Sequence, residues 1–175
     1  MAFSMSDLNA SELQEVGATL SSTKASDYGN RSDVELQWAM KAMDHATVHY
    51  NLISSVDASR LRLTQMDDTI YKHFRDTFPD LDVTNIKEND LKNPEAKQQW
   101  RNFCESYKGL IEDYNLGTLL RLCCKDDYTP ETTTFSVRTQ FLAIEIARNK
   151  EGHNNILLEM KKEKQEAEAK KEKSS

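Results

Sequence analysis

Apolar and aromatic side chains recur at helical spacing over residues 94–114, and this is the strongest periodic signal in the chain. They stand three or four positions apart and so share one helix face: Ala96, Trp100, Phe103, Tyr107, Ile111 and Tyr114. Asn93 before Pro94 is a start signal, because asparagine caps free backbone N–H groups and proline fits the first helical position. Gly109 interrupts the period at a cost of about 1 kcal/mol relative to alanine. We expect a single helix that ends near Asn115 or Gly117.

Three further segments have the pattern of amphipathic helices. The first covers about residues 32–54, the second covers 64–78 and stops at Pro79, and the third follows Ser136 and ends near Gly152. Their expected core positions are Trp38, Ala42, His45, His49 and Leu52 in the first, Met66, Ile70, Phe74 and Phe78 in the second, and Val137, Phe141, Ile144 and Ala147 in the third. The first helix also has an adjacent small-residue stripe that would let another helix approach closely, formed by Ala39, Ala42, Ala46 and Ile53.

Residues 118–135 have no clear helical period. The run 118–124 is short and apolar, which fits a buried strand or a continued helix, and the threonines at 132–134 favour an extended chain. The sequence therefore predicts a mainly α fold, a compact bundle of about four helices with a possible small β-hairpin near 118–135. We expect a flexible N-terminal arm at 1–30, a helical domain at 31–156, and a charged C-terminal tail at 157–175 that is either a solvated helix or disordered.

Charge and cysteine content restrict the class of protein. The formal net charge of −6 argues against a specific nucleic-acid partner. Three cysteines, an odd number with one adjacent pair, do not form a disulfide framework. The first residues lack a signal-peptide pattern, and no apolar run is long enough for a membrane span. We therefore expect a cytoplasmic protein with no membrane association.

The chemistry-bearing residues do not assemble into a catalytic or metal motif. His45 and His49 stand one helical turn apart and could bind zinc, but no third ligand is near in sequence. Asp67 fits a helix start better than an acid–base pair with Asp68. No phosphate-binding glycine loop is present. We expect no metal, no cofactor and no enzymatic activity.

Polar residues beside the last core helix are candidates for partner binding. Arginine is favoured at protein interfaces because it combines a rigid fork of donors with an apolar stem. Glu112 and Asp113 join the set, since they stand where a helix C-terminus would oppose negative charge, and an ion pair with Arg121 or Arg138 would explain them. The predicted partner-binding residues are Glu112, Asp113, Arg121, Arg138, Gln140, Arg148 and Asn149.

Several stretches of the chain resemble the polysaccharide biosynthesis domain-containing protein 1 family. Residues 35–43 and 50–57 are similar to the opening of that family, residues 112–122 to its central motif, and residues 138–149 to its last core helix. The similarity extends over roughly residues 28–153, with the motifs in the same order.

The resemblance implies a small, mainly helical, cytosolic eukaryotic protein with a chaperone role. Members of the family are linked to the folding of newly made translation elongation factor 1-alpha, through its GTP-binding domain at or near the ribosome. The expected partners are thus nascent or new elongation factor 1-alpha and ribosome-associated factors, bound by a monomer. The family name suggests an alternative, a transferase acting on polysaccharides.

Overall fold

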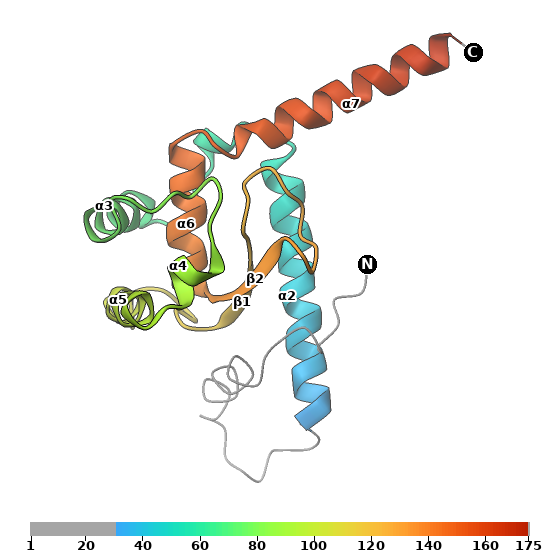
Figure 1. Cartoon of the computed structure of the whole chain (residues 1–175). Coiled ribbons are helices and arrows are strands. Elements are labelled where there is room, and N and C mark those ends of the chain that lie inside the picture. Colours follow the sequence, from blue (N-terminus) through green and yellow to red (C-terminus); the bar gives the residue numbers. More distant parts are fainter. Residues whose placement is uncertain (1–30, 175) are drawn as a thin grey trace.

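Helix α6 (Arg138–Lys150) lies at the centre of the fold, between two groups of elements (Figure 1). The computed structural model describes residues 31–174, with side chains from Asp33 onward. On one side of α6 lie α3 (Asp67–Thr77), α4 (Glu88–Lys92) and α5 (Pro94–Glu105). On the other side lie the hairpin of β1 (Gly117–Arg121) and β2 (Thr133–Val137) and the long helix α2 (Arg31–Ile53).

The expected mainly helical fold with a small hairpin is confirmed. The described residues hold six α-helices and a short 3-10 turn, η3 (Ala58–Arg60), against about four helices expected. The additional helices are the five-residue α4 and the C-terminal α7 (Asn155–Lys173). The arm predicted at residues 1–30 lies outside the described residues.

Helix α5 begins where its sequence signal places it, whereas α3 begins at Asp67, three residues after the expected start at residue 64. Asp67 accepts hydrogen bonds from the backbone N–H groups of Leu63 and Thr64, at 2.9 and 2.7 Å. The side chain of Asn93 accepts from the N–H of Ala96 at 2.8 Å. The Asn93 contact satisfies a backbone donor that the start of α5 leaves free. The Asp67 contacts instead fix the turn before α3, whose N-cap residue, Met66, makes no side-chain cap hydrogen bond.

The single helix expected over residues 94–114 is wrong in its second half. Helix α5 ends at Glu105, and Gly109 has a left-handed backbone with φ of 79°. The following turns carry the carbonyls of Tyr114 and Leu116 to the start of α6, where they accept from the N–H groups of Thr139 and Arg138 at 3.0 and 2.8 Å. The backbone has therefore left the helical conformation before these carbonyls, which accept from α6.

Residues 118–135 belong to an antiparallel hairpin. The sequence pattern at 118–124 is compatible with a strand or a continued helix, and the structure has the strand. Gly117 faces Val137 in the register, and Arg121 faces Thr133. One face of the hairpin meets α2 through Leu119 and Phe135, which cluster with Trp38. The indole N–H of Trp38 donates to the carbonyl of Gly117 at 3.0 Å, so α2 is joined to the first residue of β1.

Helix α6 is buried on nearly every side. All its residues from Thr139 to Asn149 are buried, including polar ones. Its apolar residues join α3 and α5 in the main core, where Phe74, Trp100 and Phe103 form a cluster of aromatic rings. Because a buried polar group needs a partner, the polar residues of α6 must be paired inside the fold.

The buried positions of α2 come from both stripes expected on this helix. Trp38, Ala42 and His49 are buried, whereas His45 and Leu52 of the same stripe are exposed. Ala46 and Ile53 of the adjacent small-residue stripe are buried. Further apolar side chains on this helix are exposed: Leu36, Met40 and Val48. Helix α2 thus carries more apolar surface than its packing covers.

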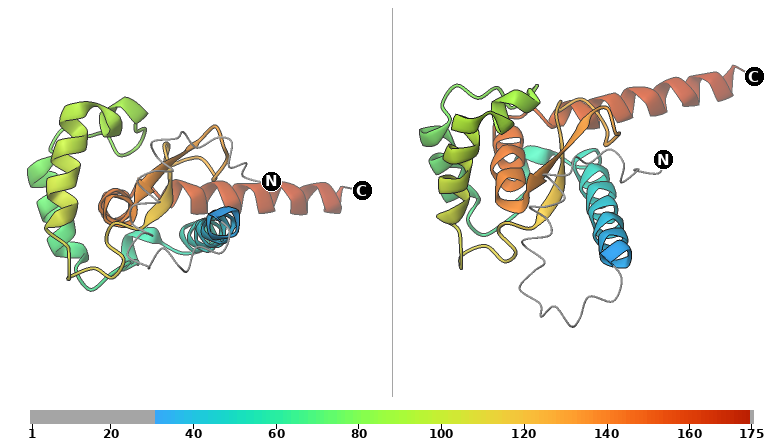
Figure 2. Two further views of the ribbon diagram at one scale, coloured as in Figure 1. Left: turned by 90° about the horizontal axis from the view of Figure 1, so that it is seen from below. Right: turned by 60° about the horizontal axis from the view of Figure 1, so that its bottom comes forward.

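Helix α7 extends away from the body of the molecule (Figures 1 and 2). Its buried residue Leu157 packs against Ile53 at the end of α2 and Ala58 of η3. Beyond Leu158 every described side chain of α7 is exposed. The charged C-terminal segment is therefore helical, and its first turn attaches it to the body.

Candidate functional site

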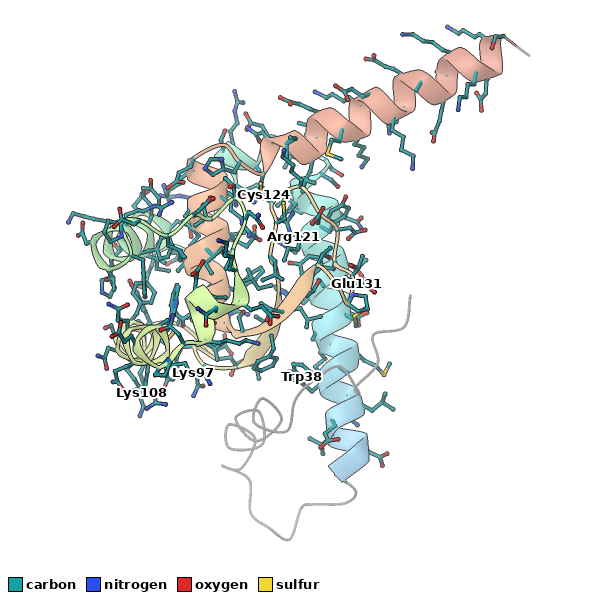
Figure 3. All side chains as sticks on the ribbon, in the orientation of Figure 1. Trp38, Lys97, Lys108, Arg121, Cys124 and Glu131 are labelled. Carbon is teal, nitrogen blue, oxygen red and sulfur yellow. The ribbon has the colours of Figure 1, made fainter. Side chains whose placement is uncertain are left out.

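Glu145 of α6 is the centre of a buried polar network. Its two carboxylate oxygens accept from Nη2 of Arg121 at 3.1 and 3.2 Å. Nη1 of Arg148 donates to Oε1 at 2.7 Å, and Nδ2 of Asn154 donates to Oε2 at 2.9 Å. The side chains of Arg121, Glu145 and Arg148 have no exposed area. Figure 3 shows Arg121 in the interior, between the hairpin and α6.

The two guanidinium groups also bind backbone carbonyls from separate parts of the chain. Arg148 donates from Nε to Val83 at 2.7 Å and from Nη2 to Arg121 and Leu122. Arg121 donates from Nη1 to the carbonyls of Cys124 and Asp126. The network therefore fixes α6 to β1, to the loop after β1 and to the segment before α4. Only arginine offers this many donors in one rigid plane.

The electrostatics of the network keep Glu145 charged and His49 neutral. Burial alone would raise the pKa of Glu145, but the positive charges of Arg121 and Arg148 outweigh it and hold that pKa far below its usual range. Burial lowers the pKa of His49 from 6.5 to about 4, against the opposing effect of Glu145, whose Oε2 lies 3.7 Å from Nε2. Its Nδ1 pairs with the hydroxyl of Tyr128 at 2.9 Å.

Three of the residues predicted to bind a partner belong to this interior network. Arg121 and Arg148 have 0% relative exposure and Asn149 has 2%, so none of them presents a surface to another protein, and their prediction as surface residues is wrong. Gln140 is buried as well. The ion pair suggested for Glu112 or Asp113 with Arg121 is also wrong, since Arg121 pairs with Glu145.

A groove of about 580 Å³ lies between α2 and the start of α6. Its α2 wall includes Trp38, Val48 and Leu52. The opposite wall comes from the segment before β1 and from α6, with Leu116 and Phe141. Val48 is 66% exposed and Leu52 is 40% exposed, so the groove is an accessible apolar surface.

Charged side chains stand among the lining residues of the groove. Lys41 and His45 come from α2, Arg138 is the first residue of α6, and Asp113 lies in the turn before β1. Although part of the His45 ring is exposed, its partial desolvation in the groove and the positive charge of Arg138 lower the pKa of this side chain. Two of the predicted partner-binding residues, Asp113 and Arg138, thus meet at the groove, whereas Glu112 is exposed outside its lining.

Most of the groove was absent from the predicted site. The sequence pattern predicts Trp38, Leu52 and Phe141 as core residues and gives no site role to Lys41 or Val48. The available signal was the apolar content of residues 34–52, which exceeds one buried stripe of a helix.

The described residues offer little chemistry for metal or thiol catalysis. No group of three His, Cys, Asp or Glu side chains within residues 33–174 is placed to hold a metal ion. The rings of His45 and His49 stack in parallel with centroids 6.3 Å apart. Burial raises the pKa of the Cys104 thiol to about 12, so this thiol stays protonated at neutral pH. Across the described helices, none combines the length and apolar character that a membrane crossing requires.

Together these features define a class: a small helical domain fixed by a buried Arg–Glu–Arg network, with an accessible apolar groove beside its long helix. The chain belongs to the PBDC1 protein family, whose model matches residues 34–159, as the sequence motifs predicted.

Relatives and a solved structure agree with this assignment. The chain is 53% identical to "Protein PBDC1" of Mus musculus over 74% of its length and 51% identical to the Homo sapiens protein over 83%. These matches cover 66% and 62% of those longer relatives. The "Protein PBDC1 homolog" of Saccharomyces cerevisiae is 44% identical and matched over its full length, with 81% of this chain covered. The solution NMR structure of protein yst0336 from Saccharomyces cerevisiae superposes with a TM-score of 0.69 at 44% identity, covering 79% of this chain and 97% of that one.

Proposed function

We propose that this protein is a non-enzymatic binding module, a chaperone that assists the folding of newly made translation elongation factor 1-alpha through its GTP-binding domain. It acts in the cytoplasm as a monomer, at or near the ribosome, where the new factor and ribosome-associated proteins meet it. Membership of the PBDC1 family supports the client, because the sequence motifs resemble a family linked to that task.

The observation that carries the proposal is the accessible apolar groove along α2. A folding intermediate exposes apolar segments that the native state will bury, and a chaperone must offer matching apolar surface. Val48 and Leu52 provide such surface while Phe141 and Leu116 form the opposite wall. Contiguous exposed apolar surface of this kind marks interaction sites in proteins. The buried network on the other side of His49 gives the groove a rigid base.

Refolding of the client tests the proposal. The isolated GTP-binding domain of elongation factor 1-alpha is diluted from denaturant with or without the full chain, and its soluble, GTP-binding fraction is measured. We expect an increase at stoichiometric amounts of the protein. The double variant Val48→Asp/Leu52→Asp places charge in the groove at exposed positions, so it should keep the fold and lose this effect.

A matched control uses an exposed leucine elsewhere. Leu110 is 62% exposed and does not line the groove, so Leu110→Asp should assist refolding like the unmodified protein. No gain in refolding with the unmodified protein would contradict the chaperone proposal. Full activity of the groove variant would show that another surface binds the client.

A further inference from the structure

The cationic side chains of the groove are without ion-pair partners among the described residues. Lys41 and Arg138 both line the groove, and neither forms a salt bridge within residues 33–174. Asp113 is the one carboxylate in the lining. The protein as a whole has a formal charge of −6, so a groove with two lysine or arginine side chains against one aspartate departs from its average surface.

Arg138 occupies a position that does not favour a cation within the fold. It is the first residue of α6, where the helix dipole opposes positive charge. Its Nε atom is buried and has no hydrogen-bond partner. Its charge also disfavours protonation of His45 and so lowers the pKa of that side chain. Among the described residues no carboxylate forms an ion pair with this cation, whereas a carboxylate of a partner bound in the groove would supply the missing negative charge.

The groove is long enough for a partner helix to lie along it. Its lining residues on α2 run from Val34 to Leu52, and at 1.5 Å per residue this wall is about 27 Å long. A partner helix of several turns can lie along such a wall and insert apolar side chains at positions i, i+3, i+4 and i+7.

We propose that the groove binds an acidic amphipathic helix of the client, with its apolar face between α2 and α6 and its carboxylates paired with Lys41 and Arg138. The inference rests on the proposed function for the identity of the client and adds the kind of segment that is recognised. Charge complementarity selects this occupant, since an apolar helix with basic flanks would place like charges at both cations.

Two fluorescent helical peptides with the same leucine positions test the charge preference. One carries glutamate beside the leucine stripe and the other carries lysine at the same positions. Fluorescence anisotropy with the full chain should show binding of the acidic peptide at least about tenfold tighter than the basic one, a preference that weakens as salt is added. Equal affinities for the two peptides would overturn the inference.

Charge reversal in the groove locates the binding. Lys41→Glu/Arg138→Glu should lower the affinity for the acidic peptide by at least about tenfold and raise the affinity for the basic peptide. The matched control reverses two exposed lysines on or just after α5, Lys97→Glu/Lys108→Glu, which lie away from α2 (Figure 3) and give the same change in net charge. Loss of acidic-peptide binding in the control as well would show a general charge effect and overturn the site.

A stability readout separates a binding role from a structural one. Arg138→Gln should leave the melting temperature unchanged or raise it, because it removes a cation from a helix start, yet it should weaken the acidic peptide. A lower melting temperature with unchanged peptide affinity would make Arg138 structural and overturn the proposal.

The N-terminal residues of this chain are an alternative occupant of the groove. Leu13 and Leu20 are apolar residues of this N-terminal segment. If Leu13→Asp/Leu20→Asp in the full chain increased peptide affinity tenfold, the chain itself would occupy the groove, and the inference would fail.

The two proposals fail in different ways. If the protein binds the acidic peptide in its groove but does not assist the folding of elongation factor 1-alpha, the proposed function is contradicted. The assignment of the groove as a site for an acidic helix then still stands. A protein that assists the factor equally well after charge reversal at Lys41 and Arg138 contradicts the groove assignment and leaves the function.

Discussion

At the scale of single residues, stability depends on the carboxylate of Glu145. It neutralises one of two buried guanidinium groups and accepts from both, at distances of 2.7–3.2 Å. Removing one partner of a buried ion pair leaves an unpaired charge away from water. We therefore expect Glu145→Gln to lower the free energy of unfolding by about 3–5 kcal/mol. Guanidinium chloride unfolding at pH 7.5 measures this loss.

The control for this prediction is the same substitution at an exposed glutamate. Glu131 lies in the loop between the strands and is exposed (Figure 3), so Glu131→Gln should change stability by no more than about 0.5 kcal/mol. A similar small effect at Glu145 would show that the network contributes little to the folded state.

His49 makes stability depend on pH below neutrality. Its pKa in the folded protein is about 4, lowered from 6.5 chiefly by burial, so the unfolded chain takes up a proton first as pH falls. The stability that the neutral ring contributes is present above pH 6.5 and is lost between pH 6.5 and 4. This group alone should reduce the free energy of unfolding by about 2 kcal/mol from pH 7.5 to pH 5.

His49→Asn tests the assignment, because an amide can replace Nδ1 as partner of Tyr128 and does not titrate. Unfolding curves at both pH values should show a smaller pH-dependent loss in this variant than in the unmodified protein. An identical pH dependence in the two proteins would assign the effect to other groups.

Sequence reasoning found the right residue types for the site but not their burial. Arg121, Arg148 and Asn149 were selected as interface residues because arginine beside a core stripe suits both an interface and an interior network. The choice between them depends on Glu145, Asn154 and the carbonyl of Val83, and the last of these is 65 positions from Arg148. Periodicity carries no information on such pairings.

At the scale of elements, Gly109 adopts a left-handed backbone conformation in the turns that follow the end of α5 at Glu105. A Cβ atom at this position would meet nothing within 4 Å, so the cost of a side chain comes from the backbone φ of 79° alone. We expect Gly109→Ala to destabilise the protein by about 1–2 kcal/mol, and Gly109→Asn to cost less because asparagine tolerates this conformation. Thermal unfolding of the two variants gives the order, and equal melting temperatures would show that the turn relaxes.

The ends of elements were predictable only where the signal is local. Asn93 and Pro94 gave the start of α5, because the cap contacts residues three positions away. Helix α5 ends at Glu105, before Gly109 with its left-handed φ of 79°, and the turns that follow lead to Tyr114 and Leu116, whose carbonyls accept from N–H groups of α6. The apolar spacing correctly predicted that Tyr107 and Ile111 are buried. It did not predict their backbone conformation, because turns can bury such residues as well as a helix can.

At the scale of the whole molecule, α7 divides into an attached turn and a solvated extension. Leu157 is 2% exposed and packs on Ile53 and Ala58, whereas residues 159–174 are exposed. The helix has 19 residues, a length of about 28 Å, and most of it contacts no core. Lys161 donates to Ser55 at 3.0 Å. The segment beyond it is rich in lysine and glutamate, residue types that can support an exposed helix when they stand three or four positions apart.

Removal of residues 163–175 should therefore leave the free energy of unfolding within about 0.5 kcal/mol of the full chain, because the side chains described there, at residues 163–174, are all exposed. Leu157→Ala should cost about 2–5 kcal/mol, since it opens a cavity where α2, η3 and α7 meet. Urea unfolding of both variants decides between an attached turn and a tail that contributes along its whole length. A large loss on truncation would require contacts beyond Lys162, and a small loss at Leu157 would mean that α7 is not anchored where it leaves the body.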